Sequence, residues 1–302
     1  MPPERRDAFT LIELLVVIVV VVMLLGILLP AVQATRVAAQ KTLCTSRFRQ
    51  IGTAIHNYES VSRQFPPSKT QSKDRRVPEH NVITFLLPFL EQQHIYDRFD
   101  FRRHWSLPPN PEAASVRLPE ILCPLAEPDR VLETDNGYFR YPSDYAACEQ
   151  FFVRNDLIEA GIIRQRSSWW SILLPSFEGV STIASVTDGL TNSMMLFECA
   201  GRPRHYKSGR IRASAFESPG EPISGTGWAD VDANFWIHRT CGPDQRQFLN
   251  CSNNNELFSF HPEGAPFLYG DGTVRFHPES IDPDAFVSFF TGCADDAIPA
   301  LP

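Results

Sequence analysis

Phe9-Thr10-Leu11-Ile12-Glu13 begins a run of 21 residues, ending at Leu29, that contains a single charged side chain. No side chain is polar from Leu14 to Leu29, and the next charge is Arg36. A helix needs about 20 predominantly apolar residues to cross the hydrocarbon core of a bilayer. The run therefore predicts one membrane-spanning helix over residues 9–29.

Glu13 is the informative residue of this run, because a carboxylate inside a spanning helix costs a few kcal/mol unless it is paired. The residues before the run, Pro2 to Ala8, form a short charged segment. In an ordinary secretory signal the charged segment leads directly into the apolar core, and the small-residue cleavage site follows that core. Here the small residue Ala8 precedes the core and the acid lies within it, which argues against such a signal.

This arrangement resembles the N-terminus of type IV prepilins and pseudopilins, whose leader peptidase cuts before the Phe of a Phe-Thr-Leu-Ile-Glu segment. The resemblance implies a leader over residues 1–8, cleavage between Ala8 and Phe9, and N-methylation of Phe9. It also implies that Glu13 neutralises the N-terminal amine of a neighbouring subunit, since a buried carboxylate needs a buried cation. Gly usually precedes the cut in these proteins. Ala8 is also small, so adequate, if slower, processing is expected.

The charges that flank the helix leave its orientation open, because Arg5 and Arg6 precede it while Arg36 and Lys41 follow it. The prepilin resemblance implies a bacterial inner-membrane protein that crosses once and carries its globular part on the extracytoplasmic side. The partners it implies are the membrane, the prepilin peptidase and methyltransferase, and other pilin-like subunits in a homo- or hetero-oligomer.

The apolar pattern resumes after Pro30, which either ends the spanning helix or kinks it. One helical face, with spacings of 4, 3, 4 and 3 residues, is formed by Cys44, Phe48, Ile51, Ile55 and Tyr58. We expect an N-terminal helix over residues 9–62, embedded in the membrane in its first half and packed on the globular domain by this face. Phe65-Pro66-Pro67 ends the helix.

Residues 63–302 are predicted to form one extracytoplasmic globular domain. The chain contains 25 prolines, which argues for short strands and ordered loops over long helices. Short helices are expected within residues 82–92, 151–160 and 280–290. Strands are expected at residues 121–124, 141–147, 194–198, 235–237, 257–260, 265–269 and 274–276. The predicted fold class is α+β, a pilin-like arrangement of a long helix on a mainly antiparallel sheet.

The pattern beyond the helix also resembles a large family of prepilin-like bacterial proteins built on a domain of unknown function. Its last landmark is His261, separated by nine residues from Asp271-Gly272. The other landmarks lie at residues 50–52, 56–58, 65–67, 87–92, 122–124 and 187–192. The resemblance implies a pseudopilin-like architecture with an enlarged C-terminal domain, and it implies no known activity.

Polar candidates for chemistry include His261, Asp271 and Glu198, and an enzyme would place the first two side by side as an acid–base pair or metal site. Asp271-Gly272 between two apolar segments is also a hairpin signal. Asp188-Gly189 is followed by Asn and Ser, which is typical turn chemistry. Turn formation accounts for these motif residues, so the sequence assigns no catalytic residue, cofactor or metal ligand.

Seven cysteines occur without a C-x-x-C pair. Disulfides are permitted outside the cytoplasm, and Cys241 and Cys251, which flank a short polar segment, are the predicted bridge. The alternative is that all seven are small buried apolar residues. The net charge is −7 and no basic stripe stands out, which argues against a nucleic-acid partner.

Two hypotheses follow for function. The first is a membrane-anchored structural or interaction protein, processed by prepilin peptidase and part of a type II secretion or type IV pilus-like assembly. The alternative is a membrane-tethered enzyme or ligand-binding module that uses the pilin-like helix only for export. Convergence of His261 and Asp271 on one pocket would support the alternative.

Overall fold

The computed structural model describes residues 11–71, 78–208, 211–212, 223–233, 235–242 and 244–294. The predicted cleavage site at Ala8 and Phe9 lies outside the described residues. The chain divides into two compact units, residues 1–43 and residues 44–302. We call the second the globular unit. It begins within the long helix, at Cys44, whereas the sequence places the domain boundary after Ser62.

Helix α1 extends from Leu11 to Ser62 and includes Pro30, so this proline does not end the helix. In the first unit the side chains of residues 11–29 are exposed, although almost all of them are apolar. This stretch is long and apolar enough to cross a membrane. A continuous exposed apolar surface of this kind is unfavourable in water and marks a membrane or protein contact.

In the globular unit, α1 buries one face, made of Cys44, Phe48, Ile51, Gly52, Ala54 and Ile55. Four of these residues belong to the stripe that the sequence predicts. The Phe48 ring packs against Tyr145, with centroids 4.3 Å apart. Gly52 permits close approach to the sheet, because a Cβ there would lie 3.0 Å from the Leu268 side chain.

A five-stranded sheet forms the centre of the globular unit among the described residues, in the order β11-β10-β6-β5-β9. Neighbouring strands are antiparallel except for β5 and β9, which are parallel. The predicted α+β fold with a mainly antiparallel sheet is therefore confirmed. The strands are β5 (Tyr145–Phe151), β6 (Met194–Glu198), β9 (Phe235–Ile237), β10 (Ala265–Tyr269) and β11 (Val274–His277).

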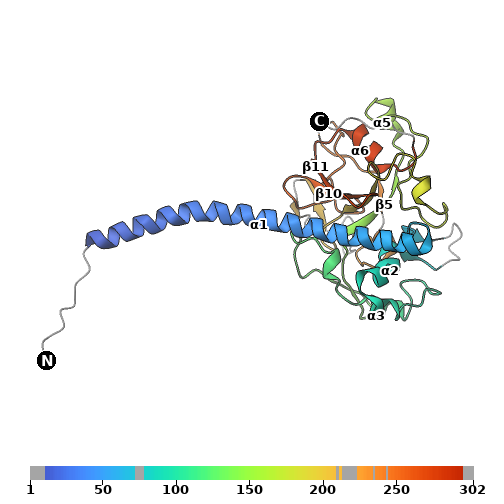
Figure 1. Cartoon of the computed structure of the whole chain (residues 1–302), viewed down its shortest axis with the longest axis horizontal. Coiled ribbons are helices and arrows are strands. Elements are labelled where there is room, and N and C mark those ends of the chain that lie inside the picture. Colours follow the sequence, from blue (N-terminus) through green and yellow to red (C-terminus); the bar gives the residue numbers. More distant parts are fainter. Residues whose placement is uncertain are drawn as a thin grey trace. The chain divides into compact units, whose positions relative to one another are not determined.

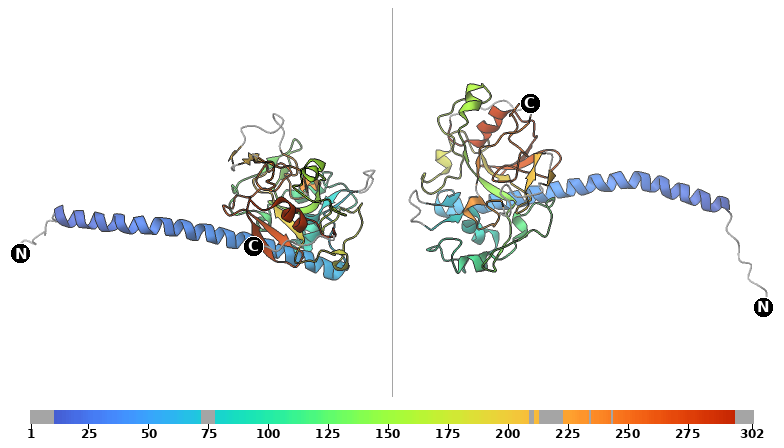
Figure 2. Two further views of the ribbon diagram at one scale, coloured as in Figure 1. Left: turned by 90° about the horizontal axis from the view of Figure 1, so that it is seen from above. Right: turned by 180° about the vertical axis from the view of Figure 1, so that it is seen from behind.

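Both faces of the sheet are covered, which explains why β6 and β10 are buried at every position. Side chains alternate between the two faces of a strand. Leu268 of β10 joins the hydrophobic cluster that contains α1, whereas Phe267 and Tyr269 join the cluster that contains helix α6 (Pro283–Phe290). Figure 2 shows α6, in dark red, beside the sheet.

Short elements complete the globular unit. In Figure 1 the helices α2 and α3 lie on the opposite side of α1 from strands β10 and β11. The short helices are α2 (Val82–Leu86), η1 (Leu87–Leu90), α3 (Gln93–Tyr96), α4 (Asn110–Ala114), η2 (Pro119–Ile121), α5 (Asn155–Glu159), η3 (Ile183–Ser185) and η5 (Val231–Ala233). The short strands are β1 (Lys69–Thr70), β2 (His80–Asn81), β3 (Leu132–Glu133), β4 (Phe139–Arg140), β7 (Tyr206–Lys207) and β8 (Ile211–Arg212).

Two predicted strands are wrong. Within residues 121–124, η2 ends at Ile121 and a loop follows it, and the first three of these residues are buried. Pro124 cannot donate to a ladder, and the backbone N–H of Cys123 donates to the Asp144 carboxylate. Residues 257–260 form no regular strand and make only an isolated bridge between Phe258 and Cys199.

Candidate functional site

The Asp271-Gly272 motif forms the turn between β10 and β11. Asp271 Oδ1 accepts hydrogen bonds from the backbone N–H and the hydroxyl of Thr273, at 2.9 and 2.7 Å. Gly272 has a φ of 81°, a backbone conformation that favours glycine. The Asp271 side chain is exposed, and its hydrogen bonds lie within its own turn. The motif therefore has a structural role in the hairpin.

The structure does not pair His261 with Asp271. His261 precedes the start of β10 at Ala265, and Asp271 follows its end at Tyr269. A five-residue strand extends about 16 Å, so its length separates the two side chains. The side-by-side arrangement of an acid–base pair, which the sequence leaves open, is thus replaced by positions beyond opposite ends of one strand.

Asp188 and Gly189 form a turn that is tied to the chain after α6. Gly189 has a φ of 90°. The Asp188 carboxylate accepts a hydrogen bond from the backbone N–H of Ala294 at 2.8 Å, and the Asp188 N–H donates to the Gly292 carbonyl at 3.3 Å. Asp188 therefore joins two distant segments in addition to shaping its own turn.

The chemically richest group is a buried cluster of four side chains, which we call the Cys–Glu–His cluster: Cys44, Cys123, Glu198 and His261. The exposed fraction of each residue is 3% or less. Cys44 comes from α1, Cys123 from the loop after η2, Glu198 from the end of β6 and His261 from the segment before β10. Four segments that are distant in sequence thus meet at one point of the globular unit.

The side-chain donor atoms of the cluster face one another. His261 Nε2 lies 3.9 Å from Glu198 Oε2 and 4.0 Å from Cys123 Sγ. One donor atom each of Cys44, Glu198 and His261 lies within 4.8 Å of the other two. Ser259 supports this geometry, because its hydroxyl donates to Glu198 Oε2 at 2.9 Å and accepts from the backbone N–H of His261 at 3.1 Å.

Burial controls the protonation of the cluster. Desolvation raises the pKa of the Glu198 carboxyl well above its usual value, and the neighbouring Cys123 raises it further. Desolvation also raises the pKa of the Cys123 thiol. Glu198 Oε1 is buried and has no hydrogen-bond partner among the described residues. Burial therefore favours the neutral forms of Glu198 and Cys123.

An ion pair beside the cluster fixes the loop that carries Cys123. Asp144 and Arg130 are joined by two hydrogen bonds, of 2.8 and 2.6 Å, and their side chains are buried. The same carboxylate accepts the backbone N–H of Cys123 at 2.7 Å and that of Gly201 at 3.1 Å. Asp144 thus positions one member of the cluster through its backbone.

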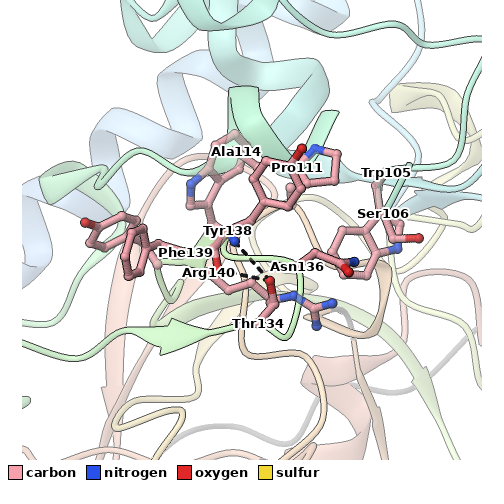
Figure 3. Close-up of a pocket in the computed structure, with 13 residues that line it drawn as sticks. Trp105, Ser106, Pro111, Ala114, Thr134, Asn136, Tyr138, Phe139 and Arg140 are labelled. Carbon is pink, nitrogen blue, oxygen red and sulfur yellow. Dashed lines mark hydrogen bonds between the residues drawn. The ribbon is translucent and has the colours of Figure 1, made fainter. Parts of the chain in front are cut away.

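The structure also contains surface cavities away from the cluster. Figure 3 shows one lined by Trp105, Tyr138 and Arg140, in which the Thr134 hydroxyl donates to the Tyr138 carbonyl at 3.0 Å. Its volume of about 50 Å³ is far below the roughly 300 Å³ of small-ligand pockets. A wider groove, of about 310 Å³, lies beside Trp236.

The predicted cysteine bridge is present in the structure, where Cys241 and Cys251 are joined by a disulfide with Cα atoms 5.6 Å apart. The five other cysteines are free thiols. Four of these are buried, and Cys293 is exposed. The sequence leaves two alternatives open, a disulfide or seven buried thiols. The structure contains one disulfide and four buried free thiols.

Sequence reasoning identified His261 and Glu198 singly, Cys123 as part of a landmark and Cys44 as part of an apolar stripe. It did not join them. The contact between Cys123 and His261 spans 138 residues of sequence, and no local pattern reports such a contact.

Comparisons with known proteins agree with this architecture. Residues 33–284 match the family described as "Protein of unknown function (DUF1559)", and residues 5–29 match the prokaryotic N-terminal methylation motif. No curated protein and no solved structure matches the chain. The spacing between His261 and Asp271 as a mark of the family stays a prediction. The match over residues 33–284 covers more than half of the 302 residues, so the chain belongs to the DUF1559 family and carries a prepilin-like N-terminus.

Proposed function

We propose that this protein is a pseudopilin-type subunit that is cut after Ala8, anchored by residues 9–29 and joined to other pilin-like subunits through α1. Its role is structural or interactive, within a type II secretion or type IV pilus-like assembly of the bacterial inner membrane. The observation that carries the proposal is the position of Glu13, which lies in an exposed apolar helix and within the match to the methylation motif.

The physical argument concerns the environment of the Glu13 carboxylate. Leu11 and Ile12 precede it and Leu14 follows it, and all three side chains are exposed and apolar. In a membrane this surface contacts lipid, and a carboxylate among apolar side chains requires a cation. The N-terminal amine that cleavage creates at Phe9 of a neighbouring subunit supplies one, so pairing and assembly are coupled.

The disulfide between Cys241 and Cys251 supports an extracytoplasmic globular unit. Disulfides persist in oxidising compartments and are rare in the cytoplasm, where thiols are kept reduced. With the globular unit outside, Arg5 and Arg6 lie on the cytoplasmic side, which positive charges favour, and Arg36 and Lys41 lie on the outer side. The disulfide, and not the flanking charges, therefore supports this orientation.

The interaction role is also favoured over the enzyme by the separation of the motif residues. The enzyme hypothesis depends on His261 and Asp271 sharing one pocket, and they lie beyond opposite ends of β10. The proposed function accordingly assigns no catalytic step to this chain.

The first prediction concerns the mature N-terminus. In a host that contains prepilin peptidase, mass spectrometry of the purified chain is expected to find N-methylated Phe9 as the first residue. In a matched host that lacks the peptidase, the leader over residues 1–8 should remain attached. A mature terminus at any other residue in the first host would overturn the proposal.

The second prediction concerns assembly. Glu13→Ala should leave the chain in the membrane fraction, because loss of a charge favours insertion of an apolar helix. Crosslinking between subunits should fall at least about tenfold, which corresponds to about 1.4 kcal/mol. The control is Val16→Ala, which shortens an apolar side chain of the same helix and removes no charge. Equal crosslinking of the Glu13→Ala and Val16→Ala chains would exclude the amine–carboxylate pairing.

A further inference from the structure

We propose that Cys44, Cys123, Glu198 and His261 bind one divalent metal ion, Zn²⁺, at the centre of the globular unit. The site goes beyond the proposed function, because neither anchoring nor assembly through α1 requires a metal. Its ligands would be two thiolates, one carboxylate oxygen and one imidazole nitrogen, all of which are donor types that Zn²⁺ accepts in proteins.

The distances fit a tetrahedral site. Zn–S bonds of about 2.3 Å and Zn–N or Zn–O bonds of about 2.0–2.1 Å place neighbouring donor atoms roughly 3.3–3.8 Å apart. The separations of His261 Nε2 from Glu198 Oε2 and Cys123 Sγ, 3.9 and 4.0 Å, exceed the values for such pairs by about 0.5 Å. The donor atoms of Cys44, Glu198 and His261 lie within 4.8 Å of one another. Metal binding would draw these side chains toward a common centre.

The buried Glu198 carboxyl group also favours a bound cation. Glu198 is completely buried, and within the part of the chain that the structure describes its Oε1 atom has no hydrogen-bond partner. An unsatisfied buried carboxyl oxygen costs free energy that a metal bond would recover. The metal would bind the thiolate and carboxylate forms of these side chains, so binding would release their protons.

The site has the properties of a structural metal centre. Four protein ligands would complete the coordination shell, and their burial leaves no open position for substrate, in contrast to catalytic zinc sites. The second shell is present as well. Ser259 donates to Glu198, and Asp144 holds the backbone of Cys123.

A metal ion bound at this site would crosslink segments of the chain that are distant in sequence. Cys44 lies at the first turn of α1 within the globular unit, and the other three ligands lie on the sheet or on the loops beside it. A metal bound by all four would fix residues 44–62 of α1 to the sheet. Because the unfolded chain lacks the assembled site, its binding free energy would add to stability.

The test uses the full chain in detergent, isolated without reductant so that the Cys241–Cys251 disulfide stays closed, and loaded with Zn²⁺ or Co²⁺. One Zn²⁺ per chain is expected by elemental analysis, and the Co²⁺ form should show thiolate-to-metal charge-transfer absorption. Cys123→Ser and His261→Gln should each lower metal affinity at least about tenfold. Cys148→Ser is the matched control, because Cys148 is a fully buried free thiol outside the cluster.

Three results would overturn the proposal: no thiolate absorption in the wild-type Co²⁺ form, a disulfide between Cys44 and Cys123 in peptide maps of the protein as isolated, or full metal binding by both cluster variants. The wild-type spectrum needs no substitution, so it decides the question even where a variant fails to fold.

Discussion

Replacing Arg130 with Met is expected to lower the free energy of unfolding by about 3–5 kcal/mol. The Arg130 side chain is 1% exposed, and its partner Asp144 is completely buried. The guanidinium forms two hydrogen bonds with the carboxylate, a third, of 2.7 Å, with the carbonyl of Arg202, and a fourth, of 2.6 Å, with the carbonyl of Glu127. Met keeps most of the apolar volume but leaves the Asp144 charge buried without its cation.

The measurement is urea unfolding of the detergent-solubilised full chain, followed by tryptophan fluorescence. Arg98→Met is the matched control, because Arg98 and Glu112 form an exposed ion pair at 3.2 Å. Exposed pairs contribute about 0–1 kcal/mol, so this change should have little effect. If the two variants lose the same stability, the buried pair has no special role.

A double variant separates the charge from the packing. Arg130→Met combined with Asp144→Asn should be more stable than Arg130→Met alone, because the neutral amide removes the unpaired buried charge. The amide oxygen of Asn can still accept one of the backbone N–H groups that Asp144 binds. A double variant that is less stable than the single one would show that the hydrogen bonds accepted by the Asp144 carboxylate outweigh the cost of its unpaired charge.

Acid is expected to destabilise the globular unit through His277, by about 3 kcal/mol between pH 7 and pH 4. Burial lowers the pKa of this imidazole to about 4, and the positive charge of Arg275 contributes. The ring stacks on Phe289, with centroids 5.5 Å apart, and its Nε2 lies 2.6 Å from the Tyr269 hydroxyl.

The direction follows from proton binding in the two states. In the unfolded chain His277 titrates near its ordinary pKa of 6.5, so between pH 6.5 and 4 the unfolded state binds more protons than the folded state. The stability that depends on neutral His277 is therefore fully present above pH 6.5. It is lost progressively as the pH falls toward 4.

The test compares His277→Gln with the wild-type chain by urea unfolding at pH 7 and at pH 4. Gln keeps an acceptor for Tyr269 and does not titrate, so the variant should lose about 3 kcal/mol less than the wild type over this interval. Effects of other titrating groups cancel in the comparison. His94→Gln, at an exposed position of α3, should behave like the wild type. An equal acid response of His277→Gln and wild type would refute the assignment.

Sequence was sufficient for features that depend on near neighbours. The apolar run to Leu29 predicts a spanning helix, because length and hydropathy alone determine whether a segment can cross a bilayer. The spacing of Cys44, Phe48, Ile51 and Ile55 predicts a buried helical face, and all four are buried. Gly272 in the hairpin turn was predictable for the same reason, since a turn is specified by a few adjacent residues.

Pattern alone failed where backbone groups bond outside their own segment. Residues 121–124 have the apolar composition of a strand, yet the N–H of Cys123 donates to Asp144, 21 residues away. Residues 257–260 are also apolar, but only one isolated bridge joins them to a neighbour. Whether an extended segment becomes a strand depends on the strand that lies beside it, and the sequence of the segment does not identify that neighbour.

The sequence was thus sufficient to predict a prepilin-like spanning segment over residues 9–29. The residues that surround His261 could be identified only from the tertiary structure. The nine-residue spacing suggested Asp271 as its partner, but β10 lies between them as an extended strand. The folded chain instead brings Cys44, Cys123 and Glu198 to His261, because the packing of α1 and a loop against the sheet sets which side chains are buried together. Membrane anchoring depends on the composition of one continuous segment. The Cys–Glu–His cluster depends on contacts between residues that are distant in sequence.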